Sequence, residues 1–143
     1  VVGLFFATEI IQRRYNTNKI NDLGGIRSQS PKFTSMFMLL VLASVALPTS
    51  FNFVGEFTVL YSLAQVNFWF ALIGGTTIIL GAYYMLKMFQ KTMLGEDNRR
   101  FFADVNTYET IVFVIIILLL FFFGLFPQGI IDLITPSLES LIK

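Results

Sequence analysis

The stretch Leu42–Leu60, LASVALPTSFNFVGEFTVL, decides the fold. It lies inside a run from Phe33 to Leu86 whose only charged residue is Glu56. A membrane-spanning helix needs about 20 apolar residues, so this run is long enough for about two spans. Pro48 interrupts the run, because proline lacks the backbone N–H of a helix and its ring clashes with the preceding turn.

The composition around this stretch is that of a membrane protein. Of the 143 residues, 55% are hydrophobic and 13% are charged, and the mean hydropathy is +0.73. Soluble domains average about 25% charged residues. A further span, roughly Tyr108–Phe126, is closed by Pro127. The sequence therefore predicts an all-α fold, a polytopic transmembrane helix bundle with one discontinuous helix.

Two missing residue types exclude several classes of function. The chain has no Cys and no His, which excludes disulfides, thiolate nucleophiles, imidazole bases, iron–sulfur clusters and His-bound haem or metal. The nine acidic residues are not clustered as a metal cage would require. We therefore expect no cofactor, no metal and no electron carrier in this chain. A net charge of +1 gives no basic footprint for nucleic acid.

The run from Phe33 to Leu86 can be divided at Pro48–Asn52 or at Gln65–Asn67. A loop at Pro48–Asn52 would leave a first helix of about 15 residues, or ~22 Å, which is too short for a hydrocarbon core of ~30 Å. Division at Gln65–Asn67 leaves a first span that is too long unless it is interrupted. We therefore interpret Pro48–Phe53 as a break inside one span, as occurs where backbone is buried in protein or lines a wet cavity.

Basic residues predict the orientation. Segments 12–32 and 87–107 both collect Lys and Arg, and such loops stay on the cytoplasmic side, which requires an even number of spans between them. The apolar start, VVGLFF, leads us to expect the C-terminal piece of a longer membrane protein. The predicted organisation is the end of a truncated helix (1–14), a cytoplasmic loop (15–32), a discontinuous transmembrane helix broken near 48–53 (33–65), a transmembrane helix (68–90), a second cytoplasmic loop (91–107), a transmembrane helix (108–126) and an outer-side tail with a short interfacial helix (127–143).

Glu56 is the candidate functional residue, with the role of proton transfer. A carboxylate near the bilayer centre costs about 2.5–3.5 kcal/mol on insertion scales, and such acids usually mark ion or proton pathways. A broken helix beside a buried acid is a recurring design in transporters. Pro48, Thr49 and Gly55 are assigned to the loop of the broken helix, with Gly55 leaving room for water or another helix. The alternative is that Glu56 touches only headgroups at the outer interface.

Three other charged residues have plainer interpretations. Lys87 and Lys91 lie where their side chains can reach the inner membrane surface, so we interpret them as orientation anchors rather than proton carriers. Glu109 follows Asn106 by three positions, which is typical of a helix capping box. A partner contact is the alternative role for Glu109.

Four segments carry a resemblance that extends over nearly all of the chain. INDLGGIRSQSP, LASVALPTSFNFVGEF, LGAYYMLKMFQKTMLGE and GLFPQGIID resemble, in order, the C-terminal end of the subunit M family of proton-pumping NADH-quinone oxidoreductase, respiratory complex I. Related antiporter-like subunits usually carry Lys at the position of Glu56, so the Glu points to subunit M. One departure is visible, because the family often has Pro-Gly-x-x-Gly where this chain has Pro48–Asn52.

The resemblance implies a 14-helix subunit, of which this chain would hold the end of helix 11 and helices 12 to 14, with helix 12 discontinuous. The family's exit-side proton carrier falls on Glu56, and its loop residues fall on Pro48, Thr49 and Gly55. Its other proton-path residues would lie before Val1. NADH, FMN, iron–sulfur clusters and quinone are expected in partner subunits, and the partners of this chain would be other membrane subunits, the lipid bilayer and protons.

Three functional hypotheses follow. The first is a proton-translocating membrane subunit of complex I, an antiporter-like subunit of a translocase that is not catalytic as this piece alone. The second is a subunit of a cation/proton antiporter or a membrane-bound hydrogenase of the same fold, and the third is a membrane scaffold without transport. The expected location is a bacterial inner membrane, in preference to the mitochondrial inner membrane.

Overall fold

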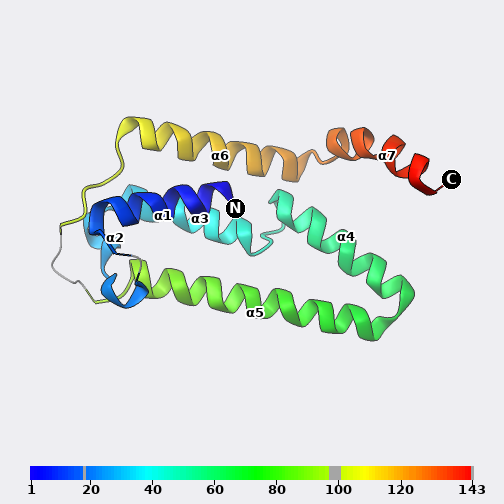
Figure 1. Cartoon of the computed structure of the whole chain (residues 1–143), viewed down its shortest axis with the longest axis horizontal. Helices are drawn as coiled ribbons and strands as arrows, with labels where there is room; N and C mark the ends of the chain where they lie inside the picture. The colour runs from blue at the N-terminus through cyan, green and yellow to red at the C-terminus, as the bar shows by residue number, and fades with distance from the viewer. Residues whose placement is uncertain (18, 97–100, 143) are drawn as a thin grey trace.

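The computed structural model describes residues 1–17, 19–96 and 101–142, with side chains as far as Thr135 (Figure 1). The described part is helical and contains no strand, which confirms the predicted all-α class. Arg99 and Arg100, which belong to the basic segment 87–107, and Lys143 lie outside the described residues. The elements are α1 (Val2–Tyr15), the 3-10 helix η1 (Ile20–Asp22), α2 (Ile26–Gln29), α3 (Pro31–Ser44), α4 (Phe51–Val66), α5 (Phe68–Met93), α6 (Thr107–Leu125) and α7 (Gln128–Ile142).

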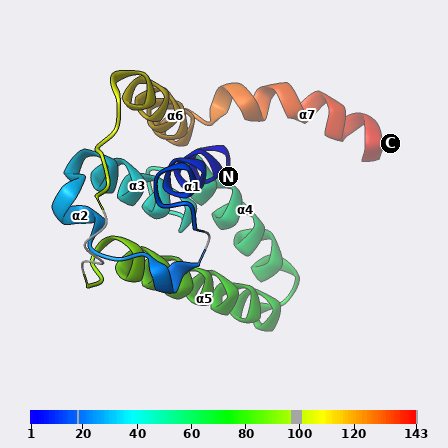
Figure 2. The same cartoon turned by 60° about the vertical axis from the view of Figure 1, so that its left-hand side comes forward.

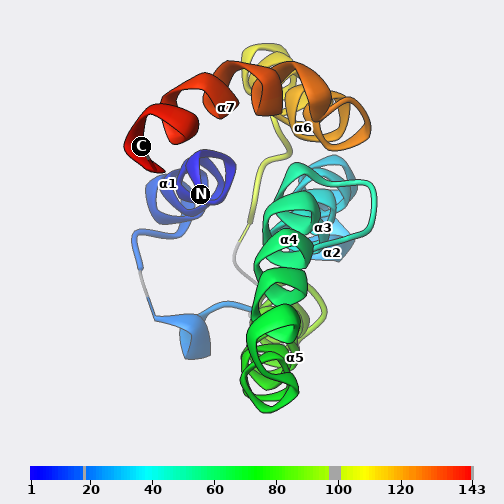
Figure 3. The same cartoon turned by 90° about the vertical axis from the view of Figure 1, so that its right-hand side faces the viewer.

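Helices α3 and α4 form the middle layer of the bundle. Helix α5 runs along one side of both, and α6 runs along the other side, so α4 lies between α6 and α5 in all three views (Figures 1, 2 and 3). Helix α1 lies beside α3. This arrangement places the junction between α3 and α4 inside the bundle.

Aromatic side chains hold these layers together. The ring centroids of Phe37 on α3 and Phe89 on α5 are 5.8 Å apart in a stacked pair. Phe113 on α6 joins two neighbours, with its ring centroid 6.0 Å from that of Phe33 on α3 and 5.0 Å from that of Phe6 on α1. Offset and edge-on ring pairs at these distances add to the energy of apolar burial.

Helices α5 and α6 are each long and apolar enough to cross a membrane. Helix α3 has 14 residues and α4 has 16, which is about 21 Å and 24 Å, and neither alone spans a core of about 30 Å. Placed in series along α5, the two half-helices make one interrupted span. Most side chains of α5 are exposed, as expected for a helix whose surroundings include lipid or further helices.

Several boundaries differ from the predicted ones. Helix α3 begins at Pro31 rather than at residue 33, because proline suits the first position of a helix. Helix α5 continues to Met93, beyond the predicted end at residue 90. The predicted loop 15–32 contains η1 and α2, and the tail contains the 15-residue helix α7.

The described parts of both basic segments lie at one end of the bundle. The end of α1, helix α2, the end of α5 and the start of α6 meet at the left in Figure 1, opposite the turn between α4 and α5 at Asn67. Their common side agrees with an even number of spans between them, while the cytoplasmic assignment stays a prediction. Lys87 is exposed, and its ammonium group donates a hydrogen bond of 2.8 Å to the hydroxyl of Tyr83.

An ionic clamp joins α1 to α6 at this end. Arg13 and Arg14 both pair with Glu109, the Arg14 contact being 2.6 Å. The Asn106 backbone N–H donates to Glu109 at 2.9 Å, and the predicted capping box at the start of α6 is confirmed. Glu109 therefore acts as a helix cap and as the acid of the clamp.

Candidate functional site

The break between α3 and α4 covers Val45–Ser50, so it starts three residues earlier than the predicted 48–53. Ala46 adopts a left-handed conformation with φ of 57°, and the Leu47 N–H then bonds back to the Leu42 carbonyl at 3.2 Å. This is the backbone pattern with which many helices end. The residue before a proline avoids the helical conformation, so α3 has to end before Pro48 rather than at it.

Two polar side chains satisfy the carbonyls that the break leaves free. The Ser50 hydroxyl lies 2.8 Å from the Leu47 carbonyl oxygen and 3.3 Å from that of Ala43. The Asn52 side-chain nitrogen donates to the same Ala43 oxygen at 3.1 Å. Unpaired backbone groups cost several kcal/mol in a membrane interior, and these bonds remove part of that cost.

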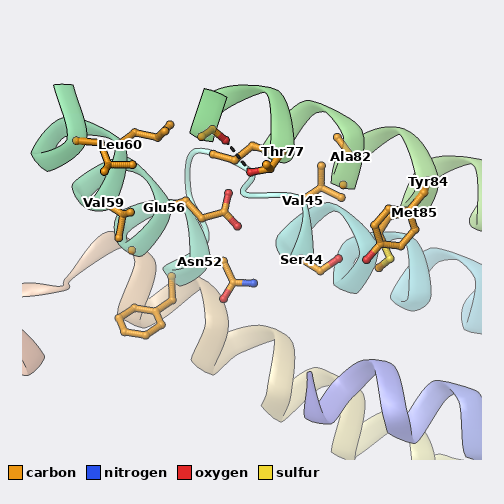
Figure 4. Close-up of a pocket in the computed structure, with 16 residues that line it drawn as sticks. Ser44, Val45, Asn52, Glu56, Val59, Leu60, Thr77, Ala82, Tyr84 and Met85 are labelled. Atoms are coloured by element: carbon orange, nitrogen blue, oxygen red, sulfur yellow. Dashed lines mark hydrogen bonds between the residues drawn. The ribbon is translucent and has the colours of Figure 1, made fainter. Parts of the chain in front are cut away.

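A cavity of about 670 Å³ opens beside the break, between α4, α5 and the end of α3 (Figure 4). Its wall includes the small residues Gly81 and Ala82 of α5, whereas Gly74 of the same wall packs closely against Leu60 and Leu63 of α4. The polar groups in its wall come from Ser44, Asn52, Glu56, Thr77 and Tyr84.

Glu56 projects from α4 into this cavity (Figure 4). The residue is half-buried, and its Oε2 atom is fully covered and has no hydrogen-bond partner among the described residues. Buried polar atoms in proteins are nearly always paired, and an exception requires an explanation such as a catalytic role or a bound water. Within the described ranges no Lys or Arg forms an ion pair with Glu56. The carboxyl group therefore faces a largely apolar cavity, without a hydrogen-bond or ion-pair partner for Oε2 among the described residues.

The other predicted site residues divide into two groups. Gly55 lines the cavity next to Glu56, and a Cβ added to it would meet no atom within 4 Å. Pro48 and Thr49 are exposed on the break and do not line the cavity. The structure thus brings Gly55 to the carboxyl group, whereas Pro48 and Thr49 affect it through the break.

Four residues that build this site have no predicted role. Ser50 and Asn52 lie inside the predicted break 48–53, where their polarity in an apolar run is a usable signal. Thr77 of α5 lies in the cavity wall together with Tyr84, and its hydroxyl donates a hydrogen bond of 2.7 Å to the Gly74 carbonyl. Nothing in the sequence marked Ala46, because alanine rarely adopts positive φ.

Comparison with known proteins gives one family. A family model described as "NADH:quinone oxidoreductase/Mrp antiporter, TM" matches residues 1–81. NADH-quinone oxidoreductase subunit M of Rickettsia typhi is 36% identical over 98% of this chain, and that of Rhodobacter capsulatus is 32% identical over 99%. NADH-ubiquinone oxidoreductase chain 4 of Arabidopsis thaliana is 28% identical over 99%. The chain spans 29%, 28% and 29% of the length of these relatives, respectively.

A solved structure shares the fold. Respiratory complex I from Thermus thermophilus with bound NADH contains a chain that matches with a TM-score of 0.83 and 29% sequence identity. The match covers 89% of this chain and 27% of that chain.

Proposed function

This chain belongs to the NADH:quinone oxidoreductase/Mrp antiporter transmembrane family, and from that premise we propose that it is the C-terminal part of a proton-translocating membrane subunit of a respiratory NADH-quinone oxidoreductase. The relatives over the full chain are named subunit M or chain 4, and the similar solved structure is a respiratory complex I. The proposed role of this part is the exit end of a proton path.

The observation that supports this role most directly is the covered, unpartnered oxygen of Glu56 beside the break. A covered carboxyl oxygen without a hydrogen-bond partner is an unsatisfied polar group, and carboxylates at membrane depth usually mark ion or proton pathways. In the proposed cycle Glu56 receives a proton from a lysine of the preceding part of the subunit and releases it toward the outer side. Because the two groups interact, each would set the protonation of the other.

The remaining parts of the proposal concern the assembly. Electrons would pass through partner subunits that hold NADH, flavin, iron–sulfur clusters and quinone, since this chain has neither the Cys nor the His to ligate such centres. The chain would lie in a bacterial inner membrane, as supported by the relatives from Rickettsia typhi and Rhodobacter capsulatus. Lipid and the other membrane subunits of the complex would surround α5, which is largely exposed.

The test is Glu56→Gln in the complete complex. Glutamine keeps the shape of the side chain but has no ionisable carboxyl group, so proton pumping and quinone reduction should both fall by about tenfold or more. Glu9→Gln, on the exposed side of α1, is the matched control and should leave both rates unchanged. Assembly is verified by NADH oxidation with an artificial electron acceptor. Wild-type pumping and quinone reduction in an assembled Glu56→Gln complex would show that the assigned role is wrong.

The second candidate is a subunit of a cation/proton antiporter, since the matching family model covers Mrp antiporters as well. The two candidates differ in their dependence on electron flow. An antiporter subunit would exchange Na⁺ for protons in membranes without NADH or quinone, whereas the complex I subunit would translocate protons only while quinone is reduced.

A further inference from the structure

Gly124 of α6 meets the helix break backbone to backbone. A Cβ placed on Gly124 would lie 2.6 Å from the Ser50 carbonyl carbon and 2.7 Å from the Phe51 nitrogen, and it would overlap the Thr49 carbonyl oxygen. Cβ atoms in real proteins essentially never approach another atom within 3.0 Å. Only glycine therefore allows α6 to lie where it does.

The contact between α6 and the start of α4 also includes a pair of aromatic side chains. The rings of Phe51 and Phe123 pack edge-on, with their centroids 6.4 Å apart. The backbone atoms that face Gly124 belong to Thr49 and Ser50, the last two residues of the break, and to Phe51, the first residue of α4. The backbone of α6 thus contacts the chain at the point where α4 begins.

Glu56 lies in the second turn of α4, so its position depends on where α4 begins. Helix α4 lies between α6 on one side and α5 on the other, and the cavity into which Glu56 projects lies on the side of α5 (Figures 1 and 4). A displacement of the first turn away from α6 would move α4 toward α5 and narrow the cavity.

We propose that Gly124 is a positioning residue for Glu56, because its missing side chain sets the start of α4 and so the place of the carboxyl group in the cavity. This inference deepens the proposed function and rests on it for its effect on proton transfer. Its structural part, that residue 124 controls the surroundings of Glu56, holds independently of what Glu56 does.

The first experiment measures the surroundings of Glu56 directly. The intact complex is treated with dicyclohexylcarbodiimide, which reacts with protonated carboxyl groups in apolar surroundings, and labelling of the Glu56 peptide is followed by mass spectrometry. In Gly124→Ala the narrowed cavity should slow labelling by about threefold or more, because close-packed side chains transmit the added volume. The matched control is Gly75→Ala in α5, where a Cβ would meet no atom within 4 Å. Labelling of Gly124→Ala at the control rate, or faster, would overturn the inference.

The second experiment tests whether the effect on turnover passes through Glu56. Gly124→Ala should lower quinone reduction by about fivefold, and in the double variant with Glu56→Gln the rate should equal that of Glu56→Gln alone, since residues that act through one another are not additive. Multiplied losses in the double variant would show that Gly124 serves packing only. If Glu56→Gln has the wild-type rate, the proposed function fails, while the labelling experiment still decides the inference.

A second variant tests the same junction in case the Gly124→Ala complex assembles poorly. Phe123→Ala removes the ring contact with Phe51 at the same junction without adding an atom. It loosens the start of α4 rather than pushing it, so labelling of Glu56 should become faster by about threefold or more as the cavity opens. An unchanged or slower labelling rate in Phe123→Ala would contradict the role of this junction.

Discussion

Asn52 and Ala43 are joined across the helix break by a hydrogen bond of 3.1 Å from the Asn52 side-chain nitrogen to the Ala43 carbonyl oxygen. Ala43 is buried in the last turn of α3, and Asn52 is in the first turn of α4. The bond therefore ties the end of one half-helix to the start of the next. It also leaves the Asn52 side chain in the wall of the cavity that contains Glu56.

We predict that Asn52→Ala lowers the stability of this junction by about 1–2 kcal/mol, because a buried carbonyl loses its best donor and only the 3.3 Å contact from Ser50 remains. The measurement is the temperature at which the subunit is lost from the solubilised complex. Ser62→Ala is the matched control, since Ser62 is exposed and its hydroxyl bonds to the Thr58 carbonyl one turn earlier in the same helix. Equal temperatures for both variants would contradict the bridging role of Asn52.

Ala46 gives a prediction of opposite sign. Its φ of 57° is a conformation that glycine adopts at no steric cost, so Ala46→Gly should keep or raise stability, by up to about 1 kcal/mol. Ala64→Gly is the control in the exposed interior of α4 and should lower stability by about 0.5–1 kcal/mol. A loss of stability in Ala46→Gly as large as in Ala64→Gly would show that residue 46 is not in the left-handed region.

The interrupted helix could be predicted because length and proline both constrain it. The segment 33–65 is too long for one membrane-spanning helix and too short for two, and with Pro48 inside it an interruption is the simplest solution. The start of the break could not be predicted, because it depends on Ala46 adopting positive φ, and this conformation is stabilised by the tertiary hydrogen bonds of Ser50 and Asn52.

The site could be predicted in part for a similar reason. An acid in an apolar run is conspicuous in a sequence, so Glu56 was identified from its neighbours alone. The cavity, by contrast, is formed by α4, α5 and the end of α3. The small residues of α5 in its wall, Gly81 and Ala82, are indistinguishable in sequence from small residues of close helix packing. The backbone contact of Gly124 depends on the position of α6, which no local pattern specifies.

The ionic clamp at the other end of the bundle predicts a difference between two neighbouring arginines. The Arg14 side chain is 12% exposed and bonds to Glu109 and to the Ala103 carbonyl, whereas the Arg13 side chain is 57% exposed. Arg14→Ala leaves the buried Glu109 with less compensation and should cost about 1–3 kcal/mol. Arg13→Ala should cost less than about 1 kcal/mol, because exposed ion pairs are weak.

The same thermal assay of the solubilised complex measures both arginine variants. Salt screens exposed ion pairs more than buried ones. The stability difference between the wild type and Arg13→Ala should therefore shrink when salt is added, whereas the difference between the wild type and Arg14→Ala should hardly change. A larger loss from Arg13→Ala than from Arg14→Ala would contradict the assignment of the clamp to Arg14.

Gly55 provides the most direct test of the cavity itself. Gly55→Ala adds a Cβ that meets no atom within 4 Å, so pumping and assembly should stay within about twofold of the wild type. Gly55→Leu places a branched apolar side chain beside Glu56. It should lower pumping and quinone reduction by about tenfold, because it fills the space through which the carboxyl group would exchange its proton. The two variants share a position and differ only in how much of the cavity they fill, so a helix-propensity effect, which favours both over glycine, cannot produce the difference. Equal pumping by Gly55→Ala and Gly55→Leu in assembled complexes would mean that Glu56 exchanges its proton by a route outside this cavity.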